Sequence, residues 1–253
     1  MIKLSVVIMT FNEEEHIQDC LDSIKEVANE IIVVDSFSTD RTKEICLNNK
    51  VKFIEHEFEG YIEQKRWAIK QASYKHVLSI DADEILSEEL IKSIIEVKSN
   101  WTKDGYYMNR LNNYCGKWIR HSGWYPDRKL RLLDITKGTW QGHNPHEKAV
   151  MNKGTTVGYL KGNLFHYSYF TITEHIDQIN NFTSIKAKID FENNKKANLF
   201  KTLLLPLYKF IRWYFFNLGF LDGFFGLVIC LNSAHGEFIR YVKLRKMWEE
   251  KNN

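Results

Sequence analysis

The chain has 253 residues with 35 Lys and Arg against 32 Asp and Glu, so its formal net charge is only +3. A chain of this length holds one large α/β domain or one domain with an appendage. Its 44% hydrophobic content excludes a disordered chain, and its nearly balanced charge argues against a nucleic-acid-binding module. The unusual feature is an aromatic share of 14%, which must belong to the core or to a binding surface.

The four cysteines are scattered and show neither a CxxC pair nor the spacing of metal ligands, which predicts a reducing compartment. The chain begins with an apolar strand, and the polar stretch 10–15 cuts this strand off before it reaches the length of a signal-peptide core. We therefore expect a cytoplasmic protein.

Strands and helices alternate in the first part of the chain. Apolar runs predict strands at 4–9, 30–35, 51–55 and 76–81, and apolar residues at helical spacing predict helices at 17–27, 41–48 and 61–73. Asn12 and Glu15 have the spacing of a capping box that opens the first helix. The alternation predicts an α/β fold with a mostly parallel, Rossmann-like central sheet and helices on both faces.

Three polar segments, 10–13, 35–38 and 81–84, directly follow strands of this predicted sheet. Ligands of parallel sheets bind at the carboxyl ends of the strands, so we expect these segments to converge. No GxGxxG or GxxxxGK[ST] motif follows an early strand, which argues against dinucleotide and P-loop sites.

Asp81 and Asp83 are separated by one residue at the end of an apolar strand. Two carboxylates in this position can hold Mg²⁺ or Mn²⁺ and leave coordination positions for phosphate oxygens. The alternative is an acidic turn that caps a helix starting near Ser87.

After about residue 105 the alternation gives way to short aromatic and basic runs, which predict an antiparallel extension with long loops. The chain becomes helical again from Thr171, and 199–231 is its most hydrophobic segment. The longest uncharged run there has about 14 residues, fewer than the roughly 20 that span a bilayer. An amphipathic helical region lying in a membrane interface fits this pattern, and helices packed on the main domain are the alternative.

The segments SVVIMTFNEEEHIQDCLDSI, EIIVVDSFSTDRT and HVLSIDADE occur in this order near the N-terminus. Together they resemble the family-2 inverting glycosyltransferases, which have the GT-A fold. More narrowly, GYIEQKRWAI, YPDRKLRLL, the NPHE segment and GFLDGFFG resemble the lipopolysaccharide core biosynthesis glycosyltransferases, many of which are similar to glucosyltransferases.

The resemblance implies a nucleotide-sugar site lined by Thr10, Phe11, Glu13, Asp35, Lys65, Arg66 and Asp81. In this site Asp35 would contact the base and Asp81 would face the ribose. Asp83 would be the principal ligand of a divalent cation, and His166 would complete the metal or diphosphate site. A satisfied core histidine is the alternative for His166. At Arg66 the family more often has Asn, so the chain departs from the pattern there.

Inverting transfer needs a general base near the acceptor hydroxyl, and Glu147 and Asp127 are the candidates. The resemblance favours Glu147, which closes the NPHE segment and whose carboxylate His146 would orient. Asp127 lies among Arg128 and other basic residues, and a salt-bridged Asp is a poor base.

Trp124, Arg128 and Arg131 are the candidate acceptor contacts. Aromatic rings stack on sugar faces, and guanidinium groups bind phosphates. Alternating apolar and basic residues in RKLRLL equally fit a half-buried strand with a solvated face.

The sequence thus predicts a metal-dependent inverting hexosyltransferase with a UDP-sugar donor, most simply UDP-glucose. The acceptor would be a lipid-linked saccharide, such as lipopolysaccharide core or another cell-envelope glycan, at the inner face of the cytoplasmic membrane. Residues 1–195 would form the GT-A catalytic domain, with a nucleotide-binding half at about 1–104 and an acceptor-binding half at about 105–195, followed by the amphipathic helical region 196–253. The alternatives are a sugar-phosphate nucleotidylyltransferase and a catalytically degenerate scaffold of the same fold.

Overall fold

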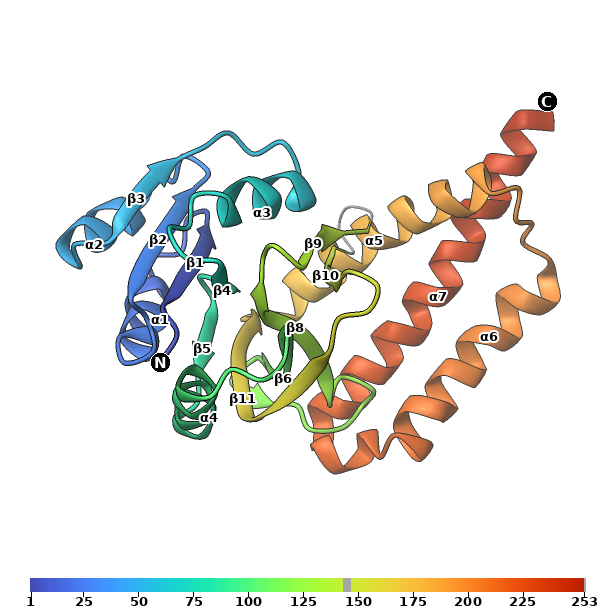
Figure 1. The fold of residues 1–253 in the computed structure, drawn as a ribbon. Helices are drawn as coiled ribbons and strands as arrows, with labels where there is room; N and C mark the ends of the chain where they lie inside the picture. The colour runs from blue at the N-terminus through green and yellow to red at the C-terminus, as the bar shows by residue number, and fades with distance from the viewer. Residues whose placement is uncertain (143–146, 253) are drawn as a thin grey trace. The chain divides into compact units, whose positions relative to one another are not determined.

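The computed structural model describes residues 1–142 and 147–252 (Figure 1). The chain divides into two compact units, residues 1–111 with 127–166, and residues 112–126 with 167–253. Strands β6 (Gly105–Tyr114) and β11 (Val157–Tyr169) begin in the first unit and end in the second.

The first unit begins with strands and helices in alternation. They are β1 (Leu4–Thr10), α1 (Ile17–Ile24), β2 (Glu30–Asp35), α2 (Thr42–Asn48), β3 (Lys52–Glu55), α3 (Tyr61–Ile69) and β4 (His76–Asp81). Strands β1, β2, β3 and β4 pair in parallel in the order β3-β2-β1-β4. This half of the sheet confirms the Rossmann-like arrangement expected from the alternating sequence.

Helices cover both faces of the parallel half because every second side chain of a strand points to the same face. Leu4, Val6 and Ile8 of β1 pack with residues of α1 and of α4 (Glu88–Ser99). Val7 of β1 packs instead with Ala68 of α3 on the other face.

The second half of the sheet is antiparallel. It contains β5 (Glu84–Leu86), β6, β8 (Asp127–Asp134) and β11, and β8 pairs with β4 so that the sheet runs β4-β8-β6-β11-β5. Strands β9 (Gly138–Gln141) and β10 (Lys148–Met151) form a separate antiparallel pair. The expected antiparallel extension is therefore present, and the α/β GT-A fold class is confirmed, with the parallel pairing limited to the first four strands.

The expected capping box at Asn12 and Glu15 is wrong. Helix α1 begins at Ile17, and its N-cap His16 makes no side-chain cap hydrogen bond. Asn12 adopts a left-handed backbone with φ of 53°, and its Oδ1 accepts a hydrogen bond from the amide of Thr39 at 2.8 Å. Asn12 thus connects the loop after β1 to the loop after β2. This is a tertiary contact, which the local spacing of the sequence does not reveal.

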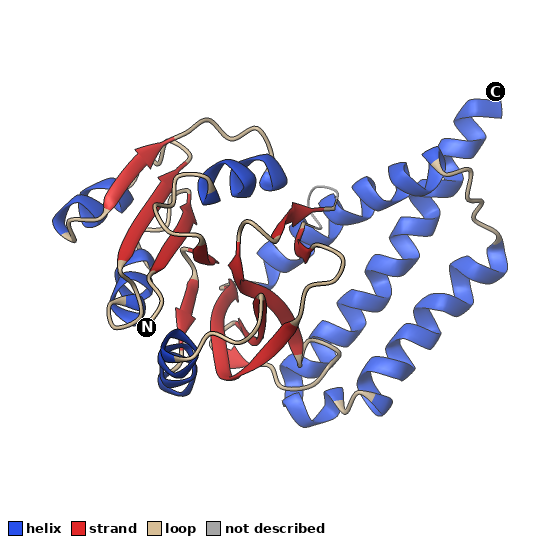
Figure 2. Cartoon of the chain, in the orientation of Figure 1, coloured by secondary structure: helices blue, strands red, loops and turns tan. Residues whose placement is uncertain are grey.

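The second unit is helical apart from its loops, the strand ends and β7 (Lys117–Trp118) (Figure 2). Its helices are α5 (Ile172–Glu192), α6 (Leu199–Ile211), the π-helical η1 (Arg212–Phe216), the 3-10 helix η2 (Gly219–Asp222) and α7 (Gly223–Asn252). Helix α7 packs against both α5 and α6. Among the described residues no single helix is long and apolar enough to cross a membrane, whereas the bent pair Leu199–Phe216 and Gly219–Lys251, at 70°, passes that test by length and composition.

Candidate nucleotide-sugar site

The polar segments that follow β1, β2 and β4 meet at one edge of the sheet, as expected. The amide of Ser36 donates to Thr10 O at 3.0 Å, and the amide of Ala82 donates to Met9 O at 3.0 Å. The side chain of Asn12 reaches the loop after β2. The carboxyl ends of three parallel strands therefore form a single polar edge.

The acidic segment after β4 does not serve as a helix cap. Helix α4 begins at Glu88, and its N-cap Ser87 accepts a hydrogen bond from the Leu90 amide. Asp81 and Asp83 are left for other partners. The capping alternative considered for this segment is therefore wrong.

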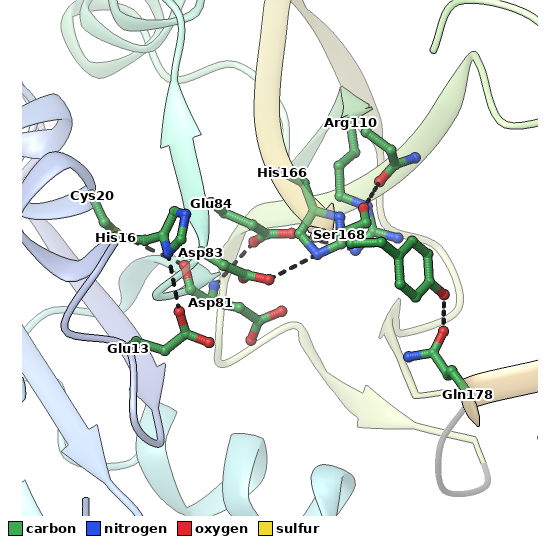
Figure 3. Close-up of polar contacts among 12 residues, drawn as sticks. Glu13, His16, Cys20, Asp81, Asp83, Glu84, Arg110, His166, Ser168 and Gln178 are labelled. Carbon is green, nitrogen blue, oxygen red and sulfur yellow. Dashed lines mark hydrogen bonds and ion pairs between the residues drawn. The ribbon is translucent and has the colours of Figure 1, made fainter. Parts of the chain in front are cut away.

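Asp83 points at the imidazole of His166 (Figure 3), with 3.1 Å between Oδ2 and Nε2. The antiparallel register of β5 and β11 places His166 opposite Glu84, which explains why residues so far apart in sequence meet. Burial would raise the pKa of the Asp83 carboxyl, but the nearby His166 imidazole outweighs burial and keeps this pKa below its ordinary value.

Glu13 is partly buried near other carboxylates, and its Oε2 lies 3.6 Å from Nδ1 of His16. Burial, together with the carboxylates of Asp83, Asp40 and Asp81, raises the pKa of Glu13 to about 8. A divalent cation near Asp83 would relieve this repulsion, because it favours the ionised form of neighbouring carboxylates.

Two buried cations neutralise Asp81. Lys65 Nζ lies 3.0 Å from Asp81 Oδ1, and Arg131 Nη2 lies 2.9 Å from Asp81 Oδ2. Burial would raise the pKa of Asp81, but these cations outweigh it and hold the pKa well below its usual range. Both cations also lie over the ring of Trp140, Lys65 at 4.6 Å and Arg131 at 5.4 Å from its centroid.

Arg131 is not an exposed group of a solvated strand face. Its side chain is buried, and Nη2 also contacts Glu84 Oε1 at 2.6 Å. Arg128 is exposed instead, and its guanidinium is 5.1 Å from the ring of Tyr159. The structure thus separates two residues that the sequence grouped as acceptor contacts.

Trp124, the third acceptor candidate, belongs to the second unit. There it packs in an aromatic cluster with Tyr114, Tyr169 and His175. Its surroundings are those of a small hydrophobic core.

The two candidate bases have different partners. Among the described residues, Glu147 has an ion pair with Lys65, at 3.1 Å, and shares this lysine with Asp81. Asp127 contacts Arg110 at 2.9 Å and Lys129 at 3.0 Å. The predicted salt-bridged state of Asp127 is therefore present, with Arg110 as the principal partner. His146 lies outside the described residues.

The remaining predicted nucleotide contacts lie along the same edge. Thr10 is buried, and within the described part of the chain its Oγ1 has no hydrogen-bond partner. Phe11 is 57% exposed. Asp35 is fully buried and accepts hydrogen bonds from the amide and the hydroxyl of Ser38. Arg66 Nε donates to Trp140 O at 2.7 Å.

Sequence reasoning missed Glu84, which is fully buried and accepts a hydrogen bond from the Asp81 amide at 3.0 Å. Arg110 also contacts Glu84, at 3.5 Å. The sequence signal was a third carboxylate directly after the Asp81 and Asp83 pair, together with arginines on later strands. Only the antiparallel pairing shows that these groups neutralise one another.

Asp83 and His166 together offer two ligand atoms of the kinds that bind Mg²⁺ or Mn²⁺, which is part of a coordination shell. Within residues 1–142 and 147–252 no group of three or more His, Cys, Asp and Glu side chains is placed to hold a metal ion. A carboxylate and an imidazole 3.1 Å apart supply two donors, and Mg²⁺ usually completes its shell with water and substrate phosphates. Burial and the neighbouring carboxylates raise the pKa of Glu13, and a cation bound beside Asp83 would lower it again.

Comparison with known proteins agrees with this architecture. Residues 5–158 match the model of Glycosyl transferase family 2. An uncharacterized glycosyltransferase of Rickettsia typhi is 30% identical over 98% of this chain and 88% of its own length. The lipopolysaccharide core biosynthesis glycosyltransferase LpsC of Rhizobium meliloti is 26% identical over 96% of this chain and 92% of its own.

Among solved structures, TarS of Staphylococcus aureus (residues 1–349) is 16% identical with a TM-score of 0.48, and the alignment covers 98% of this chain and 92% of that chain. The family match spans more than half of the chain, and the Rickettsia typhi relative aligns over almost its whole length. The chain belongs to glycosyl transferase family 2 and is a glycosyltransferase.

Proposed function

We propose that the enzyme transfers a hexose, most simply glucose, from a UDP-sugar to a lipid-linked saccharide with inversion at the anomeric carbon and with the help of Mg²⁺ or Mn²⁺. The observation that carries this proposal is the contact between Asp83 and His166 at the carboxyl edge of the parallel strands. The name of the relative LpsC supports a saccharide acceptor such as lipopolysaccharide core.

In this proposal Asp83 and His166 hold the cation. When bound there, the cation would neutralise negative charge on the departing diphosphate. Asp81 faces the ribose, and its charge is fixed by Lys65 and Arg131. Arg131 is therefore assigned to positioning Asp81 and Glu84 rather than to the acceptor.

The remaining donor contacts are proposed from the family pattern. Thr10, Phe11 and Glu13 line the nucleotide pocket after β1, and Asp35 contacts the base. Arg66 lies at the C-terminal end of α3, next to Lys65. We propose the functional division predicted from the sequence, with a nucleotide-binding half at about 1–104 and an acceptor-binding half at about 105–195.

Glu147 is the proposed general base. Its carboxylate would take the proton of the acceptor hydroxyl as the oxygen attacks the anomeric carbon. Glu147 shares one lysine with Asp81, whereas Asp127 pairs with both Arg110 and Lys129. A carboxylate with more cationic partners is a weaker base. We therefore propose Glu147, and not Asp127, as the general base. Trp124 and Arg128 remain the proposed acceptor contacts.

The membrane is the second proposed partner. A lipid-linked acceptor is held in a bilayer, so we place the enzyme at the inner face of the cytoplasmic membrane. The exposed apolar side chains of 199–224 support this location, and no role in nucleic-acid binding is proposed.

The test measures hydrolysis and transfer of the donor by the purified full chain. UDP-glucose, UDP-galactose, GDP-mannose and dTDP-glucose are each supplied with MgCl₂, MnCl₂ or EDTA. We expect UDP release from one UDP-sugar with a cation and none with EDTA. Asp83→Ala and Glu147→Gln should each lower turnover by about 100-fold or more, whereas Leu47→Ser on the exposed side of α2 should not. Near-normal turnover in both site variants would refute the mechanism, and a chain that binds no nucleotide would instead be a degenerate scaffold.

A further inference from the structure

Helix α6 exposes one continuous apolar face. Leu199, Leu203, Leu207 and Ile211 follow one another at intervals of four residues and therefore form a row along the helix. All four are exposed, Leu207 to 54%. The adjacent row is made of Phe200, Leu204 and Tyr208, which are also exposed. Thr202 lies on the buried side of α6, which packs against α7.

The turn from α6 to α7 continues this apolar surface with exposed side chains. They are Phe215, Phe216, Leu218, Phe220, Leu221 and Phe224. Phe216 is 78% exposed and Phe224 70%. Together with the two rows on α6, these residues form what we call the α6 face.

The turn has a tightly closed backbone, and Phe215, Phe216, Phe220 and Phe224 remain exposed around it. A Cβ at Gly226 would lie 2.0 Å from Gly219 O, and a Cβ at Gly219 would lie 2.8 Å from Trp213 O. Only glycine permits this approach. Of the aromatic residues beside these glycines, Phe220 is exposed, whereas Phe225 packs on the ring of Tyr114.

Basic residues are frequent in the segments of the helical unit that hold or adjoin the α6 face. The segments 112–126 and 193–236 contain Lys117, Arg120, Lys195, Lys196, Lys201, Lys209 and Arg212. Their one acidic residue, Asp222, is buried and points inward, where its carboxylate accepts hydrogen bonds from the amides of Arg120 and His121 at 3.1 and 3.0 Å. The same residue holds Lys117, whose Nζ donates to Asp222 O at 2.6 Å. Asp222 thus places basic loop residues beside the apolar turn.

This combination favours a lipid surface over a second copy of the chain. In a symmetric dimer the same patch would face itself. Lys195 pairs with Asp190 and Lys209 with Glu237, but the exposed Arg120, Lys196, Lys201 and Arg212 would meet their own copies. An anionic bilayer supplies both an apolar layer for the rings and negative headgroups for the basic residues. Helix α6 has 13 residues and is therefore about 20 Å long, which suits a helix lying in the interface.

We propose that the α6 face docks on an anionic lipid bilayer, with its leucines and phenylalanines in the acyl boundary and the basic residues of these segments among the headgroups. The proposal deepens the membrane location given under Proposed function and rests on it. It names the segment that binds and the lipid charge that it needs.

The test is flotation of the purified full chain with vesicles of phosphatidylcholine alone and of phosphatidylcholine with phosphatidylglycerol at about three to one. We expect binding to the anionic vesicles, and weaker binding when NaCl is raised from about 0.1 M to about 0.5 M. The double variant Leu207→Ser with Phe216→Ser should lower the partition coefficient by about tenfold or more. Leu47→Ser is the matched control, because Leu47 is 55% exposed and Leu207 is 54% exposed.

UDP-glucose hydrolysis without vesicles is measured on the same proteins, so that this proposal and the proposed function can fail separately. A double variant that hydrolyses UDP-glucose normally but no longer floats supports the α6 face. Failure of the wild-type chain to bind anionic vesicles would overturn the proposal, and so would unchanged binding of the double variant. The proposal would also be overturned if sedimentation equilibrium showed that the wild-type chain is a dimer and the double variant a monomer. That result would assign the α6 face to contact with a second copy of the chain.

Discussion

His166 Nε2 lies 3.1 Å from Asp83 Oδ2, because the antiparallel pairing of β11 with β5 sets His166 opposite Glu84. Asp83 lies in the turn between β4 and β5, and His166 lies on β11. The carboxylate and the imidazole therefore meet at the edge of the sheet although they are far apart in the sequence.

His166→Ala is expected to weaken metal-dependent nucleotide binding. Removing one of the two proposed metal ligands should lower the affinity for UDP measured with MnCl₂ by about 10- to 100-fold, while the affinity measured with EDTA changes little. Isothermal titration calorimetry gives both values. His235→Ala, at an exposed position of α7, is the control. Equal losses with and without the cation would mean that His166 acts on the nucleotide and not on the metal.

Arg131→Met is expected to cost about 3–5 kcal/mol of unfolding free energy, because it leaves Asp81 and the fully buried Glu84 without their shared cation. Lys129→Met is the matched control on the same strand. Lys129 is 36% exposed and pairs with the partly exposed Asp127, so its removal should cost about 1 kcal/mol or less. Urea unfolding measures both variants. Similar losses in the two would show that the buried network contributes no more than a surface pair.

His175 is expected to make the protein sensitive to acid. Burial lowers its pKa from 6.5 to about 4, so the unfolded chain binds the proton more readily than the folded chain. This contribution to stability is complete above about pH 6.5 and is lost as the pH falls through about 4. Its upper limit is about 3 kcal/mol.

His175→Gln should remove that part of the pH dependence. The amide can still hydrogen-bond to the Tyr114 hydroxyl, which lies 3.0 Å from His175 Nδ1, but it does not titrate. Unfolding by urea at about pH 7 and about pH 4 should show a smaller loss in His175→Gln than in the wild type. His235→Gln should behave as the wild type does. If both variants keep the full acid sensitivity, other groups are responsible for it.

The parallel half of the fold could be predicted because its signals are local. The predicted strands 30–35 and 76–81 have the same bounds as β2 and β4. Their apolar runs end in Asp35 and Asp81, so the position of the polar edge followed from the sequence alone. Asp83 could be placed there for the same reason.

The antiparallel half could not be derived in this way, because its pairings depend on distant contacts. No local pattern tells that β8 pairs with β4 and thereby brings Arg131 to Asp81. RKLRLL was correctly considered as a strand, but its register decides which basic residue is buried. The register turns Arg131 inward and Arg128 outward. The two arginines look alike in the sequence.

Asp222 is expected to hold the loop of residues 117–122 on the helical unit. Its carboxylate accepts hydrogen bonds from the Arg120 amide, the His121 amide and the Ser122 hydroxyl, the last at 2.7 Å. Asp222→Ala leaves these donors without their acceptor and should cost about 3 kcal/mol of unfolding free energy. Hydrogen exchange should also become faster at the amides of Arg120 and His121 than at those of α5. Asp177→Ala, at an exposed site of α5, should change neither quantity, and unaltered exchange at Arg120 and His121 in Asp222→Ala would show that the loop is held by other contacts.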